Sequence, residues 1–228
     1  MTKPKVMILA AGRGERMRPL SDTVPKPLLE AGGKPLIVHL IERLGRAGFH
    51  DLVINHSHLG EQIERYLGDG GRHGARIRYS HEAGGGLETG GGIFKALPLI
   101  DTDPFVVING DIWTDFPFGR LPTRLEGLAH LVLVDNPPQH PQGDFALRDG
   151  RVYADGEARL TFSGIGVYAR ELFADCRPGK FPLAPLLRAA MARTQVSGEL
   201  YTGDWRDVGT PQRLEELDRE LRRSPENS

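Results

Sequence analysis

Residues 5–20, KVMILAAGRGERMRPL, decide the fold, because an apolar run the length of a strand passes directly into a loop of glycines and arginines. Residues 5–11 are predicted to form a buried strand. Gly12 and Gly14 then lie where backbone amides can close on an anionic ligand with no Cβ in the way. No Walker lysine follows, and the third glycine of a dinucleotide fingerprint is missing. Alone, such a loop is more often an ordinary turn, so the rest of the chain has to decide.

Strand-length apolar runs alternate with helix-length amphipathic stretches through the first half of the chain. This alternation predicts an α/β fold, in which helices cover both faces of a mostly parallel sheet. The expected strands are residues 5–11, 51–55, 76–80 and 105–109, and the expected helices are residues 36–48, 59–67 and 92–99.

The second half of the chain changes texture after an expected strand at residues 128–135. Asp149-Gly150 suits a tight turn between strands at 145–147 and 152–153, which predicts a small accessory hairpin region. Further expectations are a strand at 161–169, a helix at 183–193, a short strand pair at 199–202 and 205–208, a helix at 211–221 and a frayed tail at 222–228. With no repeats and no low-complexity linker, the 228 residues are expected to form one domain, 1–228.

The composition points to small-molecule partners. The chain has 29 Lys plus Arg against 30 Asp plus Glu, which excludes the basic footprint of a nucleic-acid-binding protein or a polybasic membrane patch. Its single cysteine, Cys176, excludes an internal disulfide framework and a Cys-rich zinc site. Neither an export signal nor a membrane span is visible at the first apolar run, so we expect a cytoplasmic protein.

Two features beyond the first loop could carry charge chemistry. Residues 25–28, PKPL, place Lys26 between two prolines that fix the backbone, so its ammonium can act as a positioned charge. Asp111 follows the expected strand at 105–109, and Asp207 lies two residues before a glycine, so both carboxylates could meet at one rim of the sheet. Magnesium suits such a pair, because it prefers one or two carboxylates together with phosphate oxygens. Each residue alone is as often a cap, a turn residue or a solvated lysine.

Taken in order along the chain, these motifs resemble those of the sugar-1-phosphate nucleotidyltransferase family. The similar stretches are GRGERMRPL at 12–20, PKPL at 25–28, GLETGGG at 86–92, VINGD at 107–111, SGIGVY at 163–168 and WRDVGTP at 205–211. The resemblance covers nearly the whole chain. It implies a Rossmann-like catalytic domain that joins a sugar 1-phosphate to a nucleoside triphosphate and releases pyrophosphate.

The resemblance also implies roles for individual residues. A triphosphate would lie over the first loop, and Mg²⁺ would join it to Asp111 and Asp207. Lys26 would hold the α-phosphate and the incoming sugar phosphate, which makes Arg16, Lys26 and Asp111 the expected catalytic residues. The expected nucleotide-binding residues are Ala11, Gly12, Gly14, Glu15, Arg16, Lys26, Gly86 and Asn109, with Ala11 and Gly86 facing the base edge. The expected sugar contacts are Glu82 and Asp144.

Residues 87–97, LETGGGIFKAL, and Asn55-His56 are most similar to members of the family that join UTP to N-acetylmuramic acid 1-phosphate in peptidoglycan recycling. Mannose 1-phosphate guanylyltransferases and glucose 1-phosphate uridylyl- or thymidylyltransferases are the alternatives within the family. The groups that would read the lactyl carboxylate of muramic acid cannot be assigned from the sequence.

Two alternatives lie outside this activity. A non-catalytic nucleotide-binding module is disfavoured by the intact set of motif residues. A nicotinamide-dependent oxidoreductase is disfavoured because no acidic residue ends the second strand, where Asn55-His56 stands instead. His56 and His58 are interpreted as residues of a helix entry, and Glu88 with Thr89 as residues before a helix N-terminus at the glycine triplet. Without appended repeats, a monomer or weak homodimer is expected.

Overall fold

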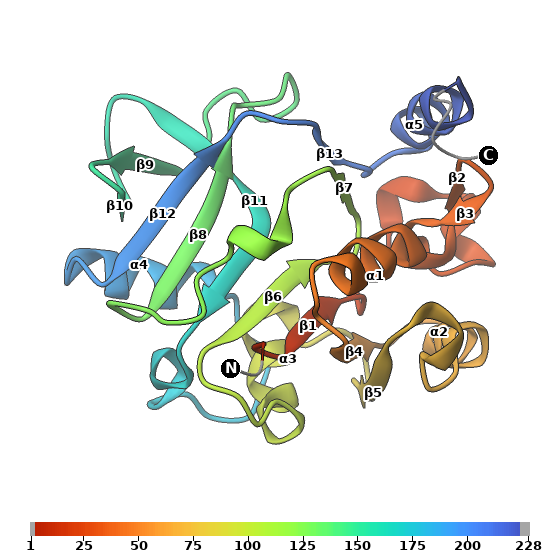
Figure 1. The fold of residues 1–228 in the computed structure, drawn as a ribbon, viewed down its shortest axis with the longest axis horizontal. Helices are drawn as coiled ribbons and strands as arrows, with labels where there is room; N and C mark the ends of the chain where they lie inside the picture. The colour runs from red at the N-terminus through yellow and green to blue at the C-terminus, as the bar shows by residue number, and fades with distance from the viewer. Residues whose placement is uncertain (1–2, 224–228) are drawn as a thin grey trace.

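The structure is a computed structural model that describes residues 3–223. A nine-stranded sheet runs through the described part of the chain (Figure 1). In sheet order the strands are β5 (Arg76–His81), β4 (Asp51–His56), β1 (Val6–Leu9), β6 (Phe105–Asn109), β11 (Arg159–Tyr168), β8 (Ala129–Val134), β12 (Val196–Tyr201), β10 (Arg151–Tyr153) and β9 (Phe145–Arg148). The expected α/β fold is confirmed.

The N-terminal half of the sheet is parallel, and it sets up the site. β1 lies between β4 and β6, and the register pairs Leu9 with Asn55 on one side and with Asn109 on the other. The carboxyl ends of these three strands therefore reach the same edge of the sheet, where Asn55 and Asn109 flank Leu9. In open α/β sheets, ligands bind at the carboxyl edge of the strands.

Helices cover both faces of the sheet because side chains alternate along each strand. Val6 and Ile8 of β1 point into one buried cluster with α1 (Leu36–Arg46) and α2 (Gly60–Leu67). Met7 points into a second cluster with α3 (Glu88–Ala96) and α4 (Ala184–Ala192). Each fully buried aliphatic side chain of this size contributes roughly 1.5–3 kcal/mol to folding.

The C-terminal half of the sheet is mostly antiparallel. β11 runs antiparallel to both β6 and β8, whereas β12 is parallel to β8. The predicted accessory hairpin is confirmed as β9 and β10, and both turn residues have positive φ, 49° at Asp149 and 72° at Gly150. That combination fits the tight hairpin turn whose twist matches the strands.

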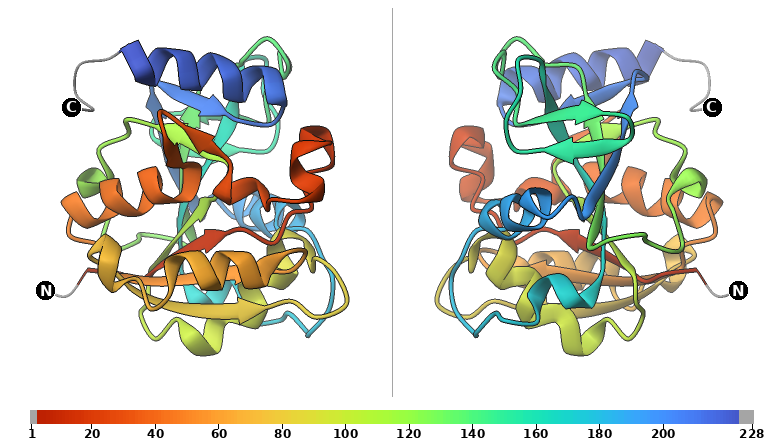
Figure 2. Two further views of the ribbon diagram at one scale, coloured as in Figure 1. Left: turned by 90° about the vertical axis from the view of Figure 1, so that its right-hand side faces the viewer. Right: turned by 90° about the vertical axis from the view of Figure 1, so that its left-hand side faces the viewer.

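A small third cluster anchors the first loop to the C-terminal helix. Met17, Trp113 and Val208 pack there with Leu214 of α5 (Pro211–Arg223). α5 lies across the top of the molecule in both views of Figure 2, next to the hairpin of β2 (Glu30–Ala31) and β3 (Lys34–Pro35). Within residues 3–223 no helix is both long and apolar enough to cross a membrane.

Two sequence-based element predictions were wrong in part. The predicted strand pair at 199–202 and 205–208 does not form: β12 pairs with β8, and β13 (Trp205–Asp207) pairs with β7 (Ile112–Thr114) instead. Local sequence cannot reveal such distant partners.

The helix predicted at 92–99 begins four residues earlier, at Glu88, and its end is a 3-10 turn, Leu97–Leu99. The glycine triplet that suggested a helix start therefore lies inside the helix. In the predicted tail, Arg222 and Arg223 still belong to α5, and residues 224–228 lie outside the described residues.

Candidate active site

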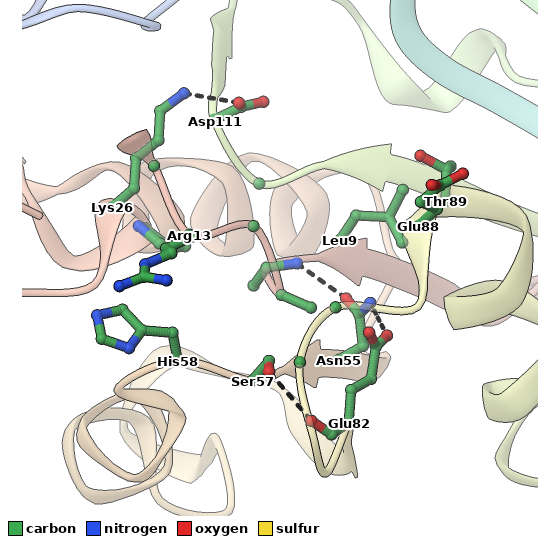
Figure 3. Close-up of a pocket in the computed structure, with 18 of the residues that line it drawn as sticks. Leu9, Arg13, Lys26, Asn55, Ser57, His58, Glu82, Glu88, Thr89 and Asp111 are labelled. Atoms are coloured by element: carbon green, nitrogen blue, oxygen red, sulfur yellow. Dashed lines mark hydrogen bonds and ion pairs between the residues drawn. The ribbon is translucent and has the colours of Figure 1, made fainter. Parts of the chain in front are cut away.

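A cavity of about 920 Å³ opens at the carboxyl edge of β1, β4 and β6 (Figure 3). All but two of the residues predicted for the site line it: Ala11, Gly12, Gly14, Glu15, Arg16, Lys26, Glu82, Gly86, Asn109 and Asp111. Asp144 and Asp207 do not line the cavity. The fold thus brings together residues that are separated by up to about a hundred positions in the chain.

The first loop is held by close packing at Gly14. Its φ is 65°, a left-handed conformation that suits glycine, and a Cβ there would come within 3.3 Å of the Cβ atoms of Lys26 and Ser21. Ser21 Oγ donates a 2.7 Å hydrogen bond to the carbonyl of Gly14. A Cβ on Gly12 would have no heavy atom within 4 Å, so the loop backbone is open at that residue.

Lys26 and Asp111 form the central charged contact of the cavity. Lys26 begins a 3-10 turn between the two prolines, and its side chain is only 9% exposed. Its Nζ lies 2.6 Å from Oδ2 of Asp111, whose side chain is 37% exposed (Figure 3). A buried ammonium is therefore paired with a carboxylate that keeps access to the cavity.

Asp207 lies beside Asp111 because β13 pairs with β7. The register places Asp207 opposite Ile112, and the Val208 amide donates a 3.0 Å hydrogen bond to the Asp111 carbonyl. Asp207 Oδ2 accepts a 2.8 Å hydrogen bond from Arg213 Nη1. The backbone thus brings the two predicted metal ligands close together, with Asp207 at the end of β13 and Asp111 directly before β7.

Gly209 joins Asp207 to the cavity wall. A Cβ on this glycine would lie 3.0 Å from Asp207 Oδ2 and 3.2 Å from Arg16 Nη2. Gly209 itself lines the cavity. Asp207 and the Arg16 guanidinium are thus neighbours across a residue that has no side chain to separate them.

Asn55 is a site residue whose structural role the sequence reasoning missed. Its Oδ1 accepts a 2.8 Å hydrogen bond from the Ala10 amide, and its Nδ2 donates a 2.7 Å bond to Glu82 Oε1. Glu82 Oε2 accepts a further 2.7 Å bond from the Leu87 amide. Asn55 is 3% exposed and Glu82 is 1% exposed, so this network is a buried part of the cavity wall (Figure 3). The sequence signal for this role was the polar Asn55 at the end of an apolar predicted strand.

The network joins the two backbone segments predicted to face the base. A Cβ on Gly86 would lie 3.5 Å from the Ala11 carbonyl, so the two segments lie side by side in the cavity wall. Both carboxylate oxygens of Glu82 accept hydrogen bonds from protein donors. Its contacts fit a residue that positions the cavity wall better than the sugar contact predicted from the sequence.

The glycine triplet has a packing explanation. A Cβ on Gly90 would lie 2.6 Å from Phe181 Cδ2, one on Gly91 would lie 2.2 Å from the Gly179 carbonyl, and one on Gly92 would lie 2.6 Å from Glu82 Oε1. Only glycine lets these groups approach so closely. α3 therefore accepts the segment 179–181 on one side and the Glu82 network on another.

The histidines occupy different places. His58 lines the cavity on the side of Arg13 (Figure 3). His56 ends β4 instead of entering a helix, and its Nε2 lies 2.5 Å from Glu64 Oε1. A Cβ on Gly60, the first residue of α2, would lie 1.9 Å from His56 Nδ1, so the glycine makes room for the ring.

Asp144 lies just before β9 and is held by protein contacts. Its Oδ2 accepts a 2.8 Å hydrogen bond from the Phe162 amide, and its Oδ1 lies 3.1 Å from His140 Nε2. Two residues beyond Phe162, a Cβ on Gly164 would come within 2.6 Å of Asn109 Nδ2. The Asp144 region thus adjoins the cavity through β11.

Comparison with known proteins agrees with this arrangement. The nucleotidyl transferase family model matches residues 5–147. The chain therefore belongs to the nucleotidyl transferase family, and the resemblance to sugar-1-phosphate nucleotidyltransferases that its motifs indicate is confirmed. It is an enzyme of the nucleotidyltransferase class.

Two relatives cover almost the whole chain. The N-acetylmuramate alpha-1-phosphate uridylyltransferase of Neisseria meningitidis serogroup B is 52% identical over 93% of this chain and 96% of its own. The protein of the same name from Caulobacter vibrioides is 37% identical over 92% of this chain and 93% of its own. Among solved structures, the inositol-1-phosphate CTP transferase from T. maritima shares the fold, with a TM-score of 0.79 and 16% identity over 98% of each chain.

Proposed function

We propose that this enzyme joins N-acetylmuramic acid 1-phosphate to UTP, giving UDP-N-acetylmuramic acid and pyrophosphate, as a step of peptidoglycan recycling. The observation that carries the proposal is the contact between Lys26 and Asp111 at a cavity whose wall includes the first loop, which is open at Gly12. The identity of 52% over 93% of the chain to a uridylyltransferase of that substrate supports the choice of sugar and base.

The proposed reaction is an in-line displacement at the α-phosphorus of UTP. A phosphate oxygen of the sugar 1-phosphate attacks, the bond from the α-phosphorus to the bridging oxygen breaks, and pyrophosphate leaves on the opposite side. The attacking oxygen is already an anion, so the enzyme needs neither a general base nor a protein nucleophile. Its task is to bring two polyanions together and neutralise their charge. Lys26 and Arg16 supply fixed positive charge for that purpose.

The acidic pair fits a magnesium ion. Asp111 directly precedes β7 and Asp207 ends its partner strand β13, and their side chains are 37% and 25% exposed. Within the described residues, no group of three or more His, Cys, Asp or Glu side chains gathers in a way that could hold a metal. Two carboxylates completed by phosphate oxygens and water are what Mg²⁺ prefers. When bound, the ion would offset the charge of the triphosphate.

Other residues receive roles from their contacts. Backbone groups at Ala11 and Gly86 would read the base, with the Asn55–Glu82 network holding both segments in place. Gly12, Gly14, Glu15 and Arg16 would contact the phosphates and ribose, and Asn109 would lie beside the nucleotide. Asp144 is retained as a candidate sugar contact because its neighbour β11 adjoins Asn109.

We also propose a single domain over residues 1–228, a cytoplasmic location and a monomer or weak homodimer. One sheet takes strands from both halves of the chain, which supports the single domain. The lone cysteine supports a reducing compartment.

Pyrophosphate release from the purified protein with Mg²⁺ tests the function. UTP, GTP, dTTP and CTP are crossed against N-acetylmuramic acid, N-acetylglucosamine, glucose and mannose 1-phosphates. We expect the highest kcat/KM with UTP and N-acetylmuramic acid 1-phosphate. Preference for another pair would replace the substrate and keep the reaction, and release from no pair would contradict the enzymatic proposal.

A further inference from the structure

We propose that Lys180 recognises the carboxylate by which N-acetylmuramic acid 1-phosphate differs from N-acetylglucosamine 1-phosphate. The two sugars share the ring, the N-acetyl group and the phosphate, and only the first carries a lactyl ether with its extra negative charge. A site selective for it therefore needs a cation or a hydrogen-bond donor that the shared reaction does not use. This inference rests on the proposed function and concerns specificity within it.

The backbone next to Lys180 is held by two hydrogen bonds of Phe181. The Phe181 amide donates a 3.2 Å hydrogen bond to the Leu87 carbonyl, and the Phe181 carbonyl accepts a 3.0 Å bond from the Gly91 amide. The Phe181 ring packs edge-on against Phe94 of α3, with ring centroids 6.3 Å apart. Gly90 and Gly91 have no side chains to block this packing, so residues 179–181 lie against α3. This packing places Lys180 at the cavity.

The Lys180 side chain meets the cavity beside Glu88. Both residues line the cavity, and Lys180 Nζ lies 3.9 Å from Glu88 Oε1. Glu88 has a φ of 60°, a left-handed backbone conformation that residues other than glycine adopt at a cost in free energy. Such backbone strain is frequent at functional sites. The pair is 64% and 45% exposed, so solvent screens it and it contributes little to stability. A ligand carboxylate can therefore replace Glu88 as the partner of Lys180 at a small cost in free energy.

The other Lys and Arg residues of the cavity lie on the side of the first loop. Within the described part of the chain they are Arg13, Arg16 and Lys26. Lys26 pairs with Asp111, and Arg16 lies near Asp207 across Gly209. All three belong to the first loop or to the segment that follows it, where we propose that the triphosphate binds.

Lys180 approaches the cavity from the opposite side. Figure 3 shows Arg13 and His58 at one side of the pocket and Glu88 with Thr89 at the other, and Lys180 belongs to the Glu88 side. In an in-line displacement the acceptor sugar and the leaving pyrophosphate lie on opposite sides of the α-phosphorus. If pyrophosphate leaves over the first loop, the sugar lies on the side of Glu88 and Lys180.

The test compares the two sugar 1-phosphates in the full-length enzyme with Mg²⁺ and UTP. Lys180→Gln should raise the KM for N-acetylmuramic acid 1-phosphate roughly 10- to 100-fold, the expected loss of one charged hydrogen bond. The KM for UTP and the KM, or inhibition constant, for N-acetylglucosamine 1-phosphate should stay within about twofold, because neither ligand has the lactyl group. Lys180→Arg should restore most of the affinity, since it restores the charge.

Arg177→Gln is the matched control, because it removes the same charge from the same exposed segment at a residue that does not line the cavity. It should leave all constants unchanged. An equal loss for both sugars in Lys180→Gln would mean that Lys180 only maintains the segment, and no loss would mean that it does not bind the acceptor; either result overturns the proposal. A wild-type enzyme inactive on N-acetylmuramic acid 1-phosphate would instead overturn the proposed function and this inference together.

Discussion

Lys26 Nζ lies 2.6 Å from Asp111 Oδ2, although the two residues are 85 positions apart in the chain. The lysine is nearly buried and the aspartate is partly open to the cavity. The cation that we assign to the phosphates and the anion that we assign to magnesium are therefore in direct contact. We expect Lys26 to exchange its contact with Asp111 for a phosphate oxygen when the nucleotide and the metal bind.

Lys26→Met should lower kcat by roughly 100-fold, because a positioned charge at the developing transition state is worth that order of rate. Methionine keeps the apolar stem that packs in the buried turn, so the fold should survive. Steady-state kinetics of Lys26→Met and Lys26→Arg check this prediction. A methionine variant with the wild-type kcat would show that the ammonium does not serve the reaction.

Asn55→Ala should raise the KM for UTP roughly tenfold, the expected cost of a lost buried hydrogen-bond partner. The change frees the Ala10 amide and removes one of the two donors to Glu82. The KM for the sugar 1-phosphate in the same variant serves as the internal reference and should change little. Equal increases for both substrates would indicate general damage to the cavity.

Gly92→Ala should destabilise the enzyme by about 1–3 kcal/mol, as overpacking does in a filled interior. The new Cβ would lie 2.6 Å from Glu82 Oε1 and 2.9 Å from Asn55 Nδ2. Alanine in a helix otherwise stabilises by about 1 kcal/mol relative to glycine. Gly45→Ala in α1, where a Cβ meets no heavy atom within 4 Å, is the control that should show that gain. Urea unfolding of both variants decides, and a stabilised Gly92→Ala would contradict the packing explanation.

His39 should make the stability depend on pH. Burial lowers the pKa of this imidazole below its ordinary value of 6.5, so the unfolded chain binds the proton more strongly than the folded one. The contribution is complete above pH 6.5 and is lost as the pH falls through the folded pKa. His39 Nε2 lies 2.8 Å from the Ala31 carbonyl, a contact that His39→Gln can keep as a donor without titrating. Urea unfolding at about pH 7.5 and about pH 5.5 should show a smaller drop in the variant; an unchanged drop would assign the effect to other groups.

The sequence predicted the parallel half of the fold because its signals are local. The alternation of strands and helices around residues 5–109 and the turn at Asp149-Gly150 need no knowledge of distant partners. The first loop, Lys26 and Asp111 came from motif order, and the structure brings them to one cavity. Their chemical roles stay predictions.

Other features depend on contacts that no local pattern records. The pairing of β13 with β7, which sets Asp207 beside Asp111, joins segments about ninety residues apart. Glycine is a poor helix former, so the triplet at 90–92 suggested a helix start; the packing of Phe181 and Glu82 explains its place inside α3. Lys180 belongs to no recognisable motif, and it reaches the cavity because residues 179–181 pack against α3.

The most direct test of the account is a single-turnover measurement with Asp111→Asn, Mg²⁺ and saturating substrates, paired with its thermal unfolding. Asparagine keeps an oxygen that accepts a hydrogen bond from Lys26 but loses the charge that we assign to the metal. We expect the variant to lose most of the rate of pyrophosphate formation while its Tm stays within a few degrees of the wild type. A rate equal to that of the wild type would contradict the assignment of Asp111 to the metal and, with it, the proposed catalytic centre.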